Sequence, residues 1–428
     1  MDAAAQKRAL VIIWITIFID LMGITLIIPF INDLVADMGG DEQSVGLLLG
    51  SYALMQLLFA PVWGRVSDRI GRRPVIIIGL GASAVAFTIF GLADELWLLF
   101  ASRMLAGMAN ANISTAQAHV ADITPPAERA GRMGLVGAAF SLGFIVGFPI
   151  GGVLSSALGN QAPVLFAAGM SLVNCLAALV ILPESLPKAM RRAASRPTGN
   201  ALQAMGSALA QIGVYWRRPA LSRLLTTFFI FTVAFSVIHV TFVEYFRDVL
   251  VLPPRDRGFV FMWIGIVGAS TQALLVKRLV GRYGEARVIE LGLLSMALGL
   301  GSIPFLRTLP LIYGGSLFIA LGNSLVLPSV MAMVSRRSGE DEQGVAMGVT
   351  QSLGSLGRII GPPYGGITYA RVNFTFPFVS AAGMALAAWV LWRGRGRGVA
   401  SGERSALSGE PPAVSVQQEI EPQRTQRE

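Results

Sequence analysis

The sequence predicts an all-α integral membrane protein, in which twelve transmembrane helices form two pseudo-symmetric six-helix bundles. Of its 428 residues, 54% are hydrophobic and 14% are charged, whereas soluble chains carry about 25% charged residues. Apolar runs of roughly the 20 residues needed to cross a bilayer recur along the chain. The second half also repeats glycines and arginines of the first half. These observations exclude a soluble enzyme, a disordered protein, a coiled coil and a disulfide scaffold.

Twelve apolar segments approach or exceed the length of a spanning helix, and most are separated by short polar loops. The first is too long for the apolar part of a cleavable signal peptide and has no small-residue cleavage site before the next loop, so we expect it to be retained. In chain order the segments cover residues 10–31, 44–64, 74–93, 96–120, 133–155, 163–182, 221–243, 258–280, 288–306, 309–334, 343–368 and 374–392.

Two longer polar stretches divide the chain into parts. The tail begins with three Arg-Gly pairs and stays polar, a composition that buries too little apolar surface to fold. We therefore expect four parts: an N-terminal six-helix bundle (1–186), a cytoplasmic linker (187–218), a C-terminal six-helix bundle (219–392) and a disordered cytoplasmic tail (393–428).

The basic residues predict the orientation in the membrane. If the N-terminus is inside, 27 of the 34 Lys and Arg residues fall in inside segments and five fall outside, while Arg103 and Arg358 lie within spans. Such a bias is typical of cytoplasmic loops, so we expect a multi-pass protein of the cell (inner) membrane with both termini cytoplasmic. The net charge of +9 comes from short clusters between spans, which favours contact with membrane lipid over nucleic-acid binding.

An internal repeat relates the two halves. A shift of 213 positions places Arg65 and Gly71 on Arg278 and Gly284, and a shift of 214 places Gly147 on Gly361. Internal repeats of this kind are typical of secondary transporters, whose substrate site lies between the repeats near the membrane midplane.

The loop between the second and third spans carries a specific motif. Residues 64–73 read Gly-Arg-Val-Ser-Asp-Arg-Ile-Gly-Arg-Arg, which resembles the corresponding loop of the major facilitator superfamily. Asp20 with Gly23, and Arg103 with Gly107, resemble the drug:proton antiporter branch of that family. Residues 121–124 and 182–185 are similar to tetracycline-efflux-type members. The resemblance covers residues 8 to about 392 and implies the major facilitator fold.

The resemblance also implies a conformational latch, an interaction between the two halves that stabilises the outward-facing state. Asp68, Arg72 and Asp122 are its candidates. By their own chemistry the loop arginines anchor to anionic lipid, and Gly71 permits a tight turn, so a purely topological role stays open. The full set of predicted latch residues is Gly64, Asp68, Arg69, Gly71, Arg72, Arg73 and Asp122.

Glycine- and proline-rich runs occupy corresponding places in spans five and eleven. They resemble the antiporter motif G-x-x-x-G-P-x-x-G-G, which is intact in span eleven but has its proline one place late in span five, and this shift weakens the antiport inference. We expect both helices to be broken or thinned there, as hinges of a rocking motion or as sites of close packing. The residues are Gly143, Gly147, Pro149, Gly151, Gly152, Gly357, Gly361, Pro362, Gly365 and Gly366.

Charged and polar side chains within the spans indicate the transport site. Asp20 lies about 15 Å along span one, where a charge is costly unless it faces the interior, is paired or is protonated. We expect Asp20, Arg103 and His239 to couple protons, with Arg103 as a partner of Asp20 or a site for an anionic substrate group. Polar stripes on the other spans predict a substrate cavity lined by Tyr52, Gln56, Asn110, Ser114, Gln117, Thr232, Ser236, Ser316, Asn323, Gln351 and Arg358.

These features predict a secondary transporter that exports a small amphipathic organic compound or drug by proton-coupled alternating access. A proton-coupled importer or facilitator of a sugar or organic acid is an alternative, and a non-transporting membrane sensor is a second. No phosphate-binding loop, nucleophile–base set or metal cluster is evident in the sequence. We therefore expect no enzyme activity, no metal and no cofactor, a proton gradient as energy source, and a monomer.

Overall fold

The computed structural model describes residues 3–110, 113–125, 128–186, 201–338 and 342–394. Within these ranges all regular elements are helices, which confirms the predicted all-α class. The predicted disordered tail lies outside the described residues from position 395 on, as does the linker from 187 to 200.

The described part of the N-terminal half contains eight α-helices, and the described part of the predicted linker contains a further one. They are α1 (Ala3–Ile27), α2 (Ile31–Asp37), α3 (Glu42–Ile70), α4 (Arg72–Gly91), α5 (Leu96–Asn110), α6 (Ile113–Ile123), α7 (Arg129–Leu158), α8 (Gln161–Ile181) and α10 (Ala201–Trp216). The C-terminal half contains α11 (Pro219–Ser236), α12 (Ile238–Asp248), α13 (Pro254–Ser270), a π-helical turn (Thr271–Leu275), α14 (Val276–Ser302), a 3₁₀ turn (Ile303–Phe305), α15 (Leu309–Arg337), α16 (Gln343–Arg371) and α17 (Phe376–Arg393).

Each predicted span overlaps one of these helices or a consecutive pair. Nine segments of the described chain are long and apolar enough to cross a membrane, and one of them, Pro254–Phe305, has 52 residues and contains two predicted spans. The chain turns between those two spans at Gly284, whose φ of 76° and ψ of 157° are not helical. Gly71, its counterpart in the first repeat, also has a positive φ, of 112°.

Several elements differ from the prediction. The first helix ends at Ile27 rather than residue 31, because the chain turns before Pro29, and the short α2 follows. The predicted linker contains α10, which packs against α3, α11 and α16. The expected breaks at the prolines are absent, since α7 continues through Pro149 and α16 through Pro362. Membrane helices tolerate proline where neighbouring helices satisfy the freed backbone groups.

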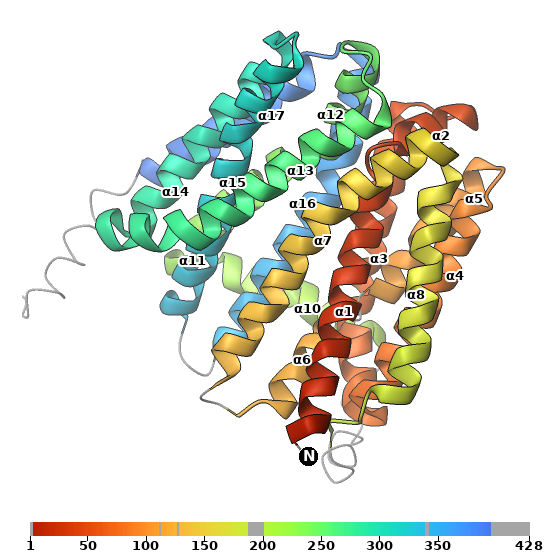
Figure 1. Ribbon diagram of the computed structural model, residues 1–428. Helices are drawn as coiled ribbons and strands as arrows, with labels where there is room; N and C mark the ends of the chain where they lie inside the picture. The colour runs from red at the N-terminus through yellow and green to blue at the C-terminus, as the bar shows by residue number, and fades with distance from the viewer. Residues whose placement is uncertain (1–2, 111–112, 126–127, 187–200, 339–341, 395–428) are drawn as a thin grey trace, which may run out of the picture.

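Each half has its own apolar core. One cluster of buried residues lies almost entirely in the C-terminal half, and two lie mainly in the N-terminal half. The halves meet through two helix pairs, α3 with α16 and α7 with α13. They converge at the end that carries α2 and α12, opposite the N-terminus, and diverge toward the N-terminus (Figure 1). We call the first of these ends the closed end.

Glycines bring the helix pairs together at the closed end. A Cβ on Gly46 of α3 would lie 2.5 Å from the carbonyl oxygen of Pro362 in α16. A Cβ on Gly258 of α13 would lie 2.5 Å from the carbonyl oxygen of Phe148 in α7. Only glycine permits so close an approach of two backbones. The two contacts are equivalent under the internal repeat.

Candidate functional site

The central polar cluster contains side chains from both halves, namely Asp20 of α1, Tyr52 of α3, Arg103 of α5, His239 of α12 and Arg358 of α16. Asp20 is 4% exposed, and its Oδ1 has no hydrogen-bond partner. Tyr52 lies within electrostatic range of Asp20, Arg103 and Arg358, and Arg358 lies within range of His239. The structure thus brings the three predicted proton-coupling residues close to two predicted cavity residues.

Arg103 is held by aromatic rings rather than by a carboxylate. Its guanidinium carbon lies 4.4 Å from the ring centre of Phe90 and 5.4 Å from that of Phe87, both on α4. Cation–π contacts of this kind stabilise a desolvated guanidinium by about 2 kcal/mol. The direct pair with Asp20 that the sequence suggested is not formed in the described structure, because the side chain of Arg103 is directed toward α4.

Arg358 and His239 lie on the C-terminal side of the cluster. Arg358 donates from Nη2 to the hydroxyl of Ser355 over 3.0 Å, one turn earlier on α16. Nδ1 of His239 lies 3.1 Å from the carbonyl oxygen of Ser236, and its ring packs edge-on against Phe235. Helix α11 ends at Ser236, and α12 begins at Ile238, directly before His239.

The other predicted cavity residues differ in their exposure to solvent. Thr232 and Ser236 are buried between α11 and α16, where they pack against Gly357 and Gly361 and donate to carbonyls of their own helix. Ser316 is also buried and donates to Tyr313. The side chain of Asn110 lies outside the described residues. Exposed or partly exposed side chains are those of Gln56, Ser114, Gln117, Asn323 and Gln351.

The predicted latch residues gather at the N-terminal end of the bundle. Arg72 pairs with Asp68 at 2.5 Å and with Asp122 at 3.3 Å, and its backbone N–H donates to Glu184 over 2.9 Å. Arg73 donates to the carbonyl of Leu179, Arg69 is exposed, and a Cβ on Gly64 would meet open space. All these contacts lie within the N-terminal half, so the contacts that the latch makes among the described residues do not reach the other half.

The predicted hinge glycines form close helix contacts. In α7, a Cβ on Gly143, Gly147 or Gly151 would clash with the backbone or side chains of α1. In α16, Gly357, Gly361 and Gly365 approach α11 and α12 in the corresponding way. Gly152 and Gly366 instead face the opposite half, 2.4 Å from the carbonyl of Pro254 and 2.2 Å from that of Glu42 by the same measure.

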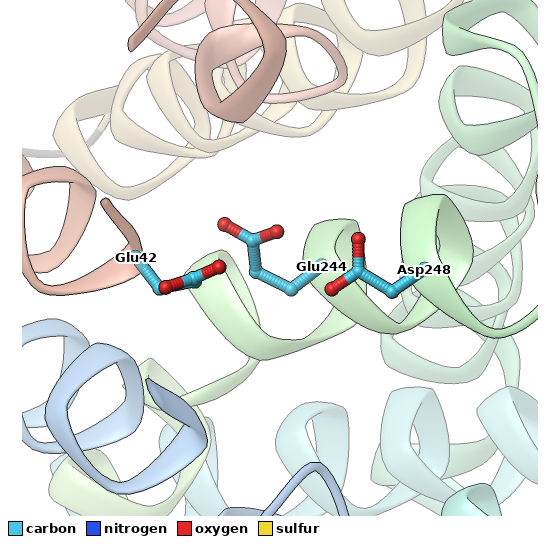
Figure 2. Close-up of side chains that lie close together, drawn as sticks. All are labelled: Glu42, Glu244 and Asp248. Atoms are coloured by element: carbon cyan, nitrogen blue, oxygen red, sulfur yellow. The ribbon is translucent and has the colours of Figure 1, made fainter. Parts of the chain in front are cut away.

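Sequence reasoning missed an ion-pair network at the closed end. Arg247 of α12 lies 2.7 Å from Glu244 and 2.8 Å from Asp248 on its own helix, and 3.5 Å from Glu42 on α3. Carboxylate oxygens of the three acids lie within 4.8 Å of one another. Figure 2 shows Glu42 approaching α12 from the N-terminal half. One guanidinium is therefore shared by three carboxylates and joins the halves.

A second cross-half pair lies beside this network. Arg257 of α13 pairs with Asp33 of α2 at 2.7 Å and donates to the carbonyls of Pro29 and Leu252. Burial raises the pKa of the Asp33 carboxyl above its usual value, although the Arg257 guanidinium opposes that shift. We call Asp33, Glu42, Glu244, Arg247, Asp248 and Arg257 the cross-half ion network.

Comparison with known families identifies the chain. The family model described as Major Facilitator Superfamily matches residues 13–277 and 254–423. The chain belongs to the major facilitator superfamily. It is therefore a multi-pass membrane transporter of a small molecule, as the sequence predicted.

Superfamily members of named function resemble it over most of its length. It is 32% identical to the tetracycline resistance protein, class C, of Escherichia coli, over 83% of this chain and 88% of that protein. It is 31% identical to multidrug resistance protein 2 of Bacillus subtilis, over 88% and 92%. A crystal structure of the human organic anion transporter MFSD10 matches 92% of this chain and all of that chain, with a TM-score of 0.70 and 25% identity.

Proposed function

We propose that the chain exports a small amphipathic organic compound or drug in exchange for protons. The observation that carries this proposal is the carboxyl group of Asp20, which is buried within a span. It has no ion-pair partner among the described residues. An ionised carboxylate at the membrane midplane costs about 2.5–3.5 kcal/mol. Taking up a proton removes that cost, so Asp20 suits a reversible proton site. The named relatives, which are tetracycline and multidrug resistance proteins, support the substrate class.

The proposed cycle uses the described conformation as one of its two states. With both termini cytoplasmic, as the bias of basic residues supports, the closed end faces outward and the protein opens to the cytoplasm. Substrate binds at the central polar cluster. Latch residues Asp68, Arg72 and Asp122 engage the C-terminal half when the inner end closes. A ligand can bias this equilibrium only through its different affinity for the two states.

No cofactor is needed in this scheme, because the proton gradient supplies the free energy. One chain carries both halves of the site, so a monomer suffices. Proton release from Asp20 to the cytoplasm restores its charge and accompanies the return to the described state after export.

Proton flux in everted membrane vesicles tests the proposal. A pH-sensitive dye reports collapse of an imposed proton gradient after addition of a tetracycline, a quinolone, a phenicol, a sugar or an organic acid. We expect a drug to elicit proton release from wild type but not from Asp20→Asn. The matched control is Asp94→Asn, which changes an exposed aspartate in the loop after α4.

Two results would contradict the proposal in different ways. A response to the sugar or the simple organic acid alone would replace drug export by import or facilitated passage of that solute. An equal drug response in Asp20→Asn would remove Asp20 from proton coupling while leaving export in place.

A further inference from the structure

Two arginines from opposite halves approach the same tyrosine at the centre of the bundle. Arg103 is 3% exposed, and Arg358 lies near the middle of α16. The hydroxyl of Tyr52 is buried without a hydrogen-bond partner, and both guanidinium groups act on it electrostatically. This arrangement places two permanent positive charges beside the interface of the halves, since an arginine keeps its proton in proteins.

Neither arginine is neutralised by a carboxylate of the described residues. Nε and Nη2 of Arg103 have no hydrogen-bond partner among the described residues, and its guanidinium lies over the rings of Phe87 and Phe90. Arg358 donates to the neutral Ser355 hydroxyl.

The charge of the cluster follows from these residues. Two arginines and one ionised Asp20 give a net charge of +1, and protonation of Asp20 raises it to +2, with His239 taken as neutral. A bound cation would add to an existing excess of positive charge in a medium of low dielectric constant. A bound anion would reduce that excess and supply the acceptors that guanidinium groups require.

Aromatic rings stand next to the arginines. The ring of Phe228 and Nη1 of Arg358 both lie within 3.7 Å of the position that a Cβ on Gly354 would take. Phe235 packs against His239 on the same side of the cluster. Phe228 is 3% exposed and supports this region from the core, so the aromatic ring open to a ligand on this side is the partly exposed Phe235 beside His239.

We propose that the substrate is an aromatic organic anion whose negative group binds Arg358 and Arg103 beside Tyr52. This inference rests on the proposed function for its transport step and adds the charge of the cargo. Arg358 is the specificity-determining residue, because it comes from the C-terminal half and, within the described part of the chain, makes no cation–π contact of the kind that holds Arg103. A substrate that contacts both arginines links the two halves, which suits a site that alternates between two openings.

A charge series on one ring system tests the inference. The probes are 2-naphthoate (anion), 2-naphthylmethylammonium (cation) and 2-naphthamide (neutral). Protection of the purified full-length protein against thermal unfolding measures binding, and dye-reported proton release in everted vesicles measures transport. We expect the anion alone to protect and to release protons, with binding about 10- to 100-fold weaker in Arg358→Gln, the range for losing a charge-assisted hydrogen bond.

Two further variants make the result specific. Arg358→Lys keeps the charge and is expected to retain most of the binding, and Arg393→Gln changes an arginine that lies against Trp389 at the end of α17 and should bind as wild type does. If Arg358→Gln fails to fold, the charge series on wild type still decides the question. Equal protection by the cation or the amide, or anion binding unchanged in Arg358→Gln, would overturn the inference. Protection by the anion without proton release would uphold it and count against the proposed proton coupling instead.

Discussion

At a pH high enough to ionise all three acids, replacing Glu244 by glutamine removes one of three negative charges that surround Arg247 where the halves meet. Glu244 is 1% exposed at its side chain, and its contact with Arg247 lies within α12. That contact is therefore the same whether the closed end is shut or open. Opening changes the distance between Glu42 and the Glu244–Arg247 pair, so the substitution acts on the equilibrium between the two conformations.

The size of the effect follows from the distances. Two unit charges 4.8 Å apart repel by about 3.5 kcal/mol at an effective dielectric constant of about 20. Glu42 is a quarter exposed, and solvent screening reduces this to about 1–2 kcal/mol. Removing the repulsion between Glu42 and Glu244 should favour the shut form by about 5- to 30-fold.

Distances between spin labels on the two halves measure this shift. Leu158 and Phe305 are 72% and 69% exposed, one on each half. Cysteines at these positions, in a chain whose buried Cys175 is replaced by serine, accept the labels. We expect Glu244→Gln to enrich the shorter distance, with Asp94→Asn as a control that leaves the distribution unchanged.

Replacing Arg247 should shift the distance distribution in the opposite direction. Arg247→Gln removes the attraction across the halves and leaves Glu42 facing Glu244 and Asp248, so the longer distance should gain. An unchanged distribution in both variants would show that the network does not bias the closed end. A shift toward the longer distance in Glu244→Gln would refute the electrostatic reasoning.

Two other predictions concern stability. Gly151→Ala would place a Cβ 1.8 Å from the carbonyl oxygen of Leu26, so the free energy of unfolding should fall by about 1–3 kcal/mol. Thermal unfolding followed by tryptophan fluorescence measures this loss, and Gly137→Ala, which has open space around its Cβ, should match wild type. Asp41 caps α3, and hydrogen bonds from Ser44 at 2.6 and 2.8 Å lower the pKa of its carboxyl. Asp41→Ala should therefore lower the free energy of unfolding by about 0.5–2 kcal/mol at neutral pH. This difference from wild type should vanish as the pH falls through the lowered pKa, and a difference that persists in acid would contradict the capping role.

The helical fold was predictable because its causes are local. Apolar runs mark the helices, and the repeat anticipates paired turns, as the positive φ of both Gly71 and Gly284 illustrates. Burial of Asp20 also follows from its place within an apolar run. The short α2 and the linker helix α10 were missed, because neither has the length of a span.

The cross-half ion network was not predictable from spacing. Arg247 and Glu42 are 205 residues apart, and basic residues near helix ends were interpreted only as markers of orientation. Glu244 carried a signal, since it is an acid within a buried apolar stretch of α12. The helical periodicity placed Arg103 and Asp20 in the interior but could not determine which neighbour each side chain would contact.

The glycine contacts at the closed end determine how the halves can move. Gly46 against Pro362 and Gly258 against Phe148 each place a bare backbone on a carbonyl, and beside the second contact the ring of Phe148 stacks on Phe261 of α13 at 4.7 Å between ring centres. Because the two contacts are copies of one another, they act as twin pivots that carry similar resistance. The protein is thereby suited to rotate about an axis through both contacts, and the ion network together with the stacked Phe148 and Phe261 rings resists opening at that end.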